Sequence, residues 1–175
     1  MIIGDYLLGY FKLIKGGIPM FLSQIYNTLN HSMQELAISQ ILEWNEKSME
    51  HGLALSFEEA KQMLLARYQI LEHYSRVELS LEVTRELIEV FSESSFINQE
   101  IYAQTLNEMH EIFYYLKNET EDRISDVQVV EVMKNFFEEE CEGSLELLRS
   151  KAEEYAEDFR RDIQIKEAMT SEDDV

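Results

Sequence analysis

Residues 102–116 read YAQTLNEMHEIFYYL, and their apolar side chains recur at alternating spacings of four and three: Tyr102, Leu106, Met109, Phe113 and Leu116. This spacing places them on one face of an α-helix. The repeat is too short for a long coiled coil, which needs several heptads. It therefore predicts a helix over about residues 99–117 that packs inside a bundle.

Three other stretches have the form of a capping box: Ser32–Glu35, Ser56–Glu59 and Ser125–Gln128. In this motif a serine at the start of a helix, and a Glu or Gln three residues later, satisfy free backbone N–H groups. Ser56 and Ser125 each precede apolar residues at helical spacing, so each predicts a new helix. Ser32 either begins a helix or lies inside one that runs on from Pro19.

The remaining helix ends follow from turn residues and polar runs. We expect a helix to end at His51-Gly52, a short connection over residues 75–80, a break capped by Asn98, a polar loop from Lys117 to Asp126 and a last helix from near Ser144. Beyond residue 52 the chain contains no proline and only one glycine, Gly143. Because both residue types break helices, their scarcity favours helix throughout.

These patterns predict an all-α fold, a bundle of six to seven helices with an apolar N-terminal helical arm. We assign residues 1–52 to the arm, residues 53–169 to an acidic bundle and residues 170–175 to a disordered tail. We expect the arm and the bundle to form one folded unit.

The chain is strongly acidic, since 15 Lys and Arg side chains stand against 35 Asp and Glu, for a net charge of −20. Such a field repels phosphate backbones and anionic lipids, so we expect no nucleic-acid partner. No apolar run reaches the roughly 20 residues that span a bilayer, so we expect no integral membrane segment. Asp5 has the wrong charge for a secretory leader, and Cys141 is the only cysteine, so we expect a cytoplasmic protein.

Metal-binding motifs are incomplete. None of the four histidines has a glutamate three residues before it, as di-metal helical bundles require. His110-Glu111 begins like the zinc-protease signature, but Tyr114 stands where the second histidine belongs. We expect no metal at His110, and we expect this histidine to lie on a helix surface or at an interface.

The loop from Lys117 to Gln128 has the length of a calcium-binding EF-hand loop. Lys117 stands at the first ligand position, Asp122 replaces the glycine of the sharp turn, and Gln128 replaces the bidentate glutamate. These departures leave a poor cation site. We therefore expect no metal and no cofactor.

Catalytic motifs are also missing, because the chain has no nucleophile elbow, phosphate-binding loop or dinucleotide fingerprint. Cys141 follows Glu138, Glu139 and Glu140. These carboxylates should raise the pKa of its thiol and disfavour the reactive thiolate. We identify no catalytic residue, and nothing in the sequence argues for an enzyme.

Three stretches resemble one family: residues 22–36, residues 96–122 and residues 141–148, the last reading CEGSLELL. It is an uncharacterised family of small acidic helical proteins from anaerobic Gram-positive bacteria, described only as a domain of unknown function. The resemblance implies a bacterial protein and brings no activity, ligand or site residue.

Residues 1–29 are unusually apolar. Monomeric proteins rarely leave a contiguous apolar surface of this kind exposed to water. This segment either packs into its own domain or forms an interface with a partner protein or a second copy. The candidate interface residues are Tyr6, Leu7, Tyr10, Phe11, Ile14, Phe21, Leu22 and Ile25. The sequence thus favours a non-catalytic interaction or regulatory protein; the alternative is an enzyme or small-ligand-binding protein with a pocket among its helices.

Overall fold

The structure is a computed structural model that describes the backbone of residues 20–172 and the side chains of residues 31–165. It divides into two compact units, residues 1–36 and residues 37–175. The boundary falls inside the stretch that the sequence assigns to the arm. Ile38 and Ile41 are buried in the core of the second unit, which explains why residues 37–52 belong with it.

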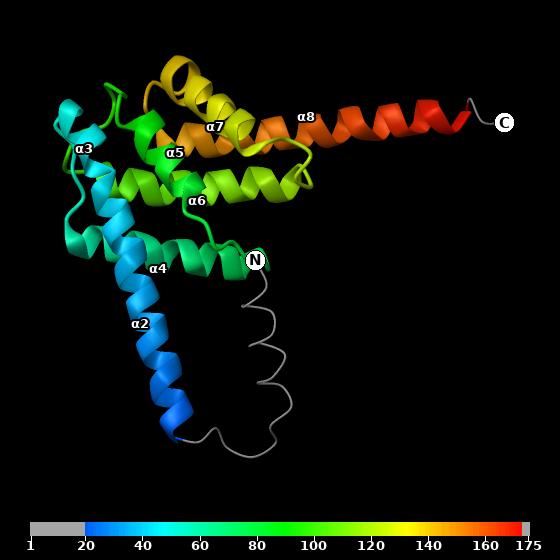
Figure 1. Ribbon diagram of the computed structural model, residues 1–175. Helices are drawn as coiled ribbons and strands as arrows, with labels where there is room; N and C mark the ends of the chain where they lie inside the picture. The colour runs from blue at the N-terminus through cyan, green and yellow to red at the C-terminus, as the bar shows by residue number, and fades with distance from the viewer. Residues whose placement is uncertain (1–19, 173–175) are drawn as a thin grey trace. The chain divides into compact units, whose positions relative to one another are not determined.

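The described residues form helices and contain no strand, so the all-α prediction is confirmed (Figure 1). In chain order the elements are α2 (Met20–Glu43), α3 (Asn45–Ser48), a 3-10 turn (Met49–His51), α4 (Phe57–His73), α5 (Glu82–Phe91), α6 (Tyr102–Glu119), α7 (Asp126–Asn135), a π-helical turn (Phe136–Glu140) and α8 (Leu145–Glu172). None of these helices is long and apolar enough to cross a membrane.

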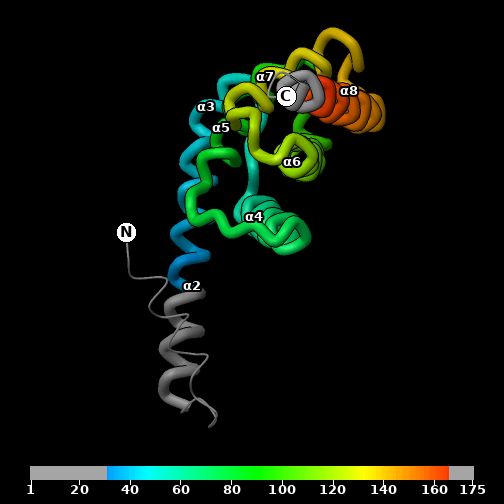
Figure 2. The backbone as a smooth tube through the Cα atoms, turned by 90° about the vertical axis from the view of Figure 1, so that its right-hand side faces the viewer, coloured from blue at the N-terminus to red at the C-terminus, as the bar shows by residue number. Residues whose placement is uncertain are grey.

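Helix α6 is the centre of the second unit. It packs against α4, α5, α7 and α8, and Figure 2 shows it between α4 on one side and α7 and α8 on the other. The apolar residues that predicted this helix are all at most 1% exposed: Tyr102, Leu106, Met109, Phe113 and Leu116. Their burial explains why α6 is central, because its apolar side chains are excluded from water only when several neighbouring helices cover them.

Two of the three capping boxes start helices. The hydroxyl of Ser56 accepts a hydrogen bond from the N–H of Glu59, and that of Ser125 accepts one from the N–H of Gln128. Ser32 lies inside α2, so the helix runs through this residue and does not begin there. Gly52 ends the 3-10 turn at φ +76°, in the left-handed conformation expected there.

Two expected boundaries were wrong, and one element was not expected. Helix α6 begins at Tyr102 and not at residue 99, because Asn98 accepts the N–H of Glu100 in a preceding turn and does not cap the helix. At its other end α6 continues to Glu119, so Lys117 lies in a helix and not in a loop. The π-helical turn after α7 was not foreseen.

Candidate functional sites

A buried polar network ties the connection between α4 and α5 to the core. Arg67 is only 2% exposed, and its guanidinium donates to the backbone oxygen of Ser80 at 2.7 Å and contacts Glu78 at 3.5 Å. The hydroxyl of Tyr114 donates to the same Glu78 carboxylate at 2.7 Å. Burial and this bond raise the pKa of Tyr114, which keeps the hydroxyl protonated as a donor. Glu78 is therefore held from α4 and α6 together.

The residues on either side of Glu78 point outward. Val77 and Leu79 are each 89% exposed, the highest values among the exposed large apolar side chains of residues 31–165. No backbone–backbone hydrogen bond of the described residues uses the N–H or C=O of Val77, Glu78 or Leu79. The segment thus presents apolar side chains and free backbone groups from an anchored position.

A hollow of about 400 Å³ lies beside Leu79, between the end of α2 and the start of α5. Its other lining residues are Gln40, Glu43, Trp44, Ser80, Leu81, Glu82 and Arg85. We call Val77, Leu79 and this hollow the Val77–Leu79 surface. Trp44 and Leu81 supply further apolar contact area at its wall.

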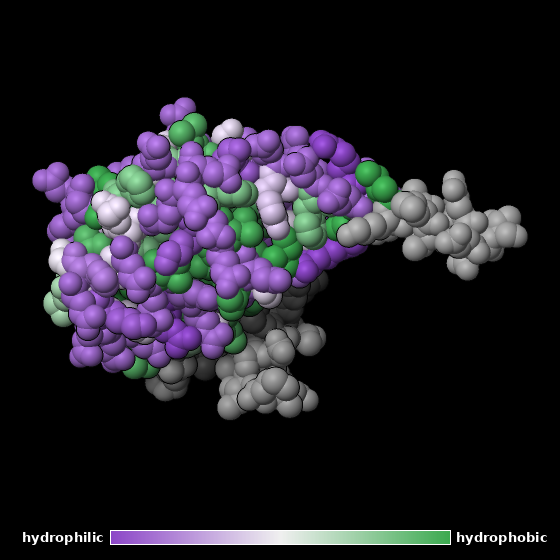
Figure 3. Space-filling view, turned by 90° about the horizontal axis from the view of Figure 1, so that it is seen from above, coloured by the Kyte–Doolittle hydropathy of each residue, from purple (hydrophilic) through white to green (hydrophobic). Residues whose placement is uncertain are grey.

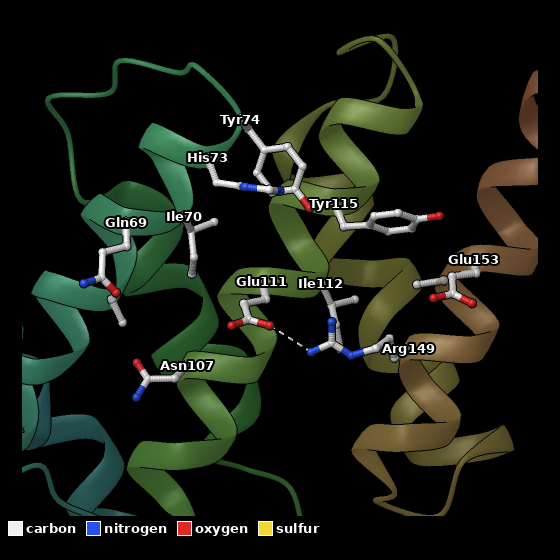
Figure 4. Close-up of a pocket in the computed structure, with 12 residues that line it drawn as sticks. Gln69, Ile70, His73, Tyr74, Asn107, Glu111, Ile112, Tyr115, Arg149 and Glu153 are labelled. Carbon is white, nitrogen blue, oxygen red and sulfur yellow. Dashed lines mark hydrogen bonds and ion pairs between the residues drawn. The ribbon is translucent and has the colours of Figure 1, made fainter.

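A second concave region lies where α4 and α8 flank α6 (Figure 4). This groove has a volume of about 410 Å³. It is lined by Ala66, Gln69, Ile70, His73 and Tyr74 of α4 and its end, by Asn107, Glu111, Ile112 and Tyr115 of α6, and by Arg149, Ala152 and Glu153 of α8. Ile112 and Ala152 are at most 1% exposed, so the floor is apolar and most polar groups stand around it.

Arg149 is the only Lys or Arg that lines the groove among the described side chains, and its charge is already matched. Its Nη2 donates to Glu108 at 2.6 Å and to Glu111 at 2.9 Å. The hydrogen bond to Glu111, together with the one to Glu108, raises the pKa of Arg149, so the guanidinium stays charged. These bonds join α6 to α8 and fix the guanidinium in place.

His110 is not on a helix surface, which was one of the two positions expected for it; it is buried where α6 contacts α5. It is 1% exposed, its Nδ1 lies 2.8 Å from the backbone oxygen of Leu106, and its Nε2 lies 2.9 Å from the hydroxyl of Thr84. A hydroxyl beside an imidazole resembles a nucleophile and its base. Both side chains are 1% exposed and neither lines the groove or the hollow described above, so the contact joins α5 to α6 inside the core.

Cys141 is buried, and burial and then Glu140 raise the pKa of its thiol, as the sequence predicted. Among the side chains of residues 31–165, no three His, Cys, Asp or Glu residues lie together as metal ligands would. The expected interface residues Tyr6, Leu7, Tyr10, Phe11, Ile14, Phe21, Leu22 and Ile25 lie outside the described side chains, so this prediction stays open.

Sequence reasoning missed both concave surfaces. The run Arg76-Val-Glu-Leu-Ser80 alternates polar and apolar residues, which could have indicated an extended segment with Val77 and Leu79 on one side. No comparable signal marked the groove, because its residues come from three helices. The face in Figure 3 is mainly hydrophilic, with scattered apolar groups.

The fold and these surfaces define the chain as an all-α helical-bundle protein. It belongs to a family of unknown function, DUF6323, which matches residues 40–165. The match spans well over half of the chain and nearly all of the second unit, and it confirms the resemblance to an uncharacterised family. No curated protein and no solved structure matches the chain.

Proposed function

We propose that this chain is a non-catalytic interaction protein and that the Val77–Leu79 surface binds an extended segment of a partner protein. The observation that carries the proposal is that an anchored residue lies between two exposed apolar ones. Glu78 is anchored by Arg67 and Tyr114, while Val77 and Leu79 on either side are almost fully exposed. The buried polar contacts of Glu78 fix this connection, so the apolar side chains beside it are displayed in a defined position.

The energetics support a binding role. Burying a Val or Leu side chain gains about 1.5–3 kcal/mol relative to leaving it in water. The fold forgoes this gain at both positions, whereas a partner that covered them would recover it. The free N–H and C=O groups of the segment can also pair with an extended partner, as when a peptide adds to a strand edge.

The charge around the surface indicates the chemistry of the partner. Glu43 and Glu82 line the hollow against the single cation Arg85, and the whole chain carries a net charge of −20. Like charges disfavour a second copy of the chain here, and a basic segment is attracted. We therefore assign the surface to a partner segment in which apolar side chains alternate with Lys or Arg.

Selection of random displayed peptides on the full chain tests this assignment. We expect enrichment of peptides that combine apolar residues with Lys or Arg. The double variant Val77→Ser with Leu79→Ser should weaken their binding at least about tenfold, because two apolar anchors are lost. The matched control is Val127→Ser with Leu147→Ser, which changes two apolar side chains that are 52% and 53% exposed on helices. That control should bind as the unchanged chain does.

Three results would overturn the assignment. Enriched peptides could bind the double variant and the control equally. Light scattering could show a dimer that the double variant loses, which would make a second copy the occupant. Peptides could bind only after residues 1–29 are deleted, which would make the chain's own N-terminal segment the occupant.

The apolar residues 1–29 remain a second candidate interface on sequence grounds alone. A cytoplasmic location in a bacterium is likewise a proposal, supported by the single cysteine and by the resemblance stated above.

A further inference from the structure

The groove between α4, α6 and α8 has the dimensions of a small-molecule site. Its volume of about 410 Å³ lies within the usual range of roughly 300–1,000 Å³. Ile70, Ile112 and Ala152 give it apolar contact area, and polar groups from all three helices converge around them. This combination is typical of a ligand site and is independent of the Val77–Leu79 surface.

The charges of the groove favour a cation. Arg149 contacts both Glu108 and Glu111 through Nη2, so its positive charge is compensated within the protein. Glu153 also lines the groove, and none of the ion pairs among the described residues involves it. Among the described residues, Glu153 is therefore a carboxylate of the groove that is not engaged in an ion pair, although Arg149 lines the same groove.

Aromatic and amide groups complete the surroundings. Tyr74 and Tyr115 line the groove, and aromatic faces attract cations. Glu111 raises the pKa of Tyr74 and Glu153 raises that of Tyr115, each after the larger effect of burial. Arg149 lowers the pKa of Tyr74 and Arg160 lowers that of Tyr115, so carboxylates and guanidinium groups both act on these hydroxyls.

Asn107 also lines the groove. Its Oδ1 atom is buried and has no hydrogen-bond partner, although buried polar atoms in folded proteins are nearly always paired. Asn107 lies on the α4 side of the groove and Glu153 on the α8 side (Figure 4). Because Oδ1 of Asn107 is closed to solvent, a ligand in the groove would not reach it, and the exposed Glu153 carboxylate is the acceptor open to a ligand.

We propose that this groove binds a small organic cation, an alkyl chain that ends in an ammonium or guanidinium group. The cationic group contacts the Glu153 carboxylate beside Tyr115. The alkyl chain lies over Ile70 and Ile112. A free amine or the Lys or Arg side chain of a protein could supply this chemistry.

Calorimetry on the full chain tests the proposal with agmatine and with a short arginine-containing peptide as probes. We expect saturable binding of one agmatine per chain. Binding of agmatine alone would identify a free amine as the source, and equal binding of the peptide would identify a protein side chain. Glu153→Gln should weaken the binding about tenfold, because this carboxylate is lost. Tyr115→Leu should weaken it about fivefold through loss of the aromatic face.

Glu154→Gln is the matched control, since it removes the same charge from the next residue of α8, outside the groove. It should change the affinity less than about twofold, which separates site binding from general attraction to an acidic surface. Equal weakening by Glu153→Gln and Glu154→Gln would overturn the proposal. So would the absence of saturable binding of both probes at millimolar concentration. Circular dichroism of each variant verifies that the helices are intact.

Discussion

The ammonium nitrogen of Lys117 lies 2.9 Å from Oδ1 of Asp126, and the lysine side chain is only 9% exposed. The same nitrogen donates to the backbone oxygen of Ile124 at 2.7 Å and lies 3.3 Å from Oδ1 of Asp122. The loop whose length resembles a calcium site thus surrounds a cation that belongs to the chain itself. Asp122, which also pairs with Arg76, adopts φ +57° at the position where a calcium loop needs glycine.

Replacing Lys117 should therefore destabilise the second unit. In Lys117→Met the Ile124 oxygen loses its buried donor, while Asp122 and Asp126 are more than half exposed and can be hydrated. We expect the free energy of unfolding to fall by about 1–3 kcal/mol, measured by urea denaturation. Lys134→Met, which loses a surface contact of 3.7 Å with Glu93, should change it by less than about 1 kcal/mol. Equal effects of the two variants would show that burial of Lys117 contributes nothing.

The free energy of unfolding should decrease as the pH is lowered, because of His110. Burial lowers the pKa of His110 to about 4 from its ordinary 6.5, so the unfolded chain takes up this proton first. Above pH 6.5 the imidazole is neutral in both states and has no effect. As the pH falls from 6.5 to 4 the unfolded state is favoured, by up to about 3 kcal/mol in total.

The variant His110→Gln isolates this effect. Its free energy of unfolding should fall less steeply than that of the unchanged chain between pH 6.5 and 4. The variant His51→Gln changes an exposed histidine and should keep the original slope. If His110→Gln and the unchanged chain have the same slope, His110 is not buried as a neutral group.

Two glycines with similar backbone angles should differ in their tolerance of alanine. Gly143 has φ +81°, and a Cβ there would stand 2.4 Å from the Cβ of Phe96, whereas Gly52 has φ +76° and open space. Gly52→Ala should cost about 1–2 kcal/mol through backbone strain alone. Gly143→Ala should cost about 1–3 kcal/mol more, because Phe96 must move. Thermal and urea denaturation of both variants measure the difference, and equal losses would contradict the close approach to Phe96.

Deleting residues 1–29 tests the prediction that this segment forms an interface. If residues 1–29 form an interface, the chain without them should keep its helical circular dichroism spectrum and lose molecular mass in light scattering. We expect this outcome because the core of the second unit begins with Ile38 and Ile41. A full-length monomer whose truncated form unfolds would show that the segment is part of the core and would end the interface hypothesis.

Local signals determined most of the helical architecture in advance. The capping boxes at Ser56 and Ser125 and the glycine at residue 52 were correctly predicted, because each acts through backbone groups within a few residues. The apolar spacing in residues 102–116 identified the central helix for the same reason. Asn98 was wrongly predicted to cap a helix, because its residue type does not show which turn it will stabilise. Lys117 was wrongly predicted to lie in a loop, because a lysine in the sequence does not show whether its ammonium group will contact buried oxygen atoms.

The sequence by itself determined that the chain is helical, that it is acidic and which apolar face of α6 is buried, since these depend on composition and on periodicity along one helix. Only the tertiary structure decided which side chains from different helices meet. Arg67, Glu78 and Tyr114 are separated by 11 and 36 residues yet share one carboxylate. Arg149 reaches Glu108 and Glu111 across 41 and 38 residues. No local pattern encodes such contacts, because they depend on how whole helices pack, and both proposed binding surfaces rest on them.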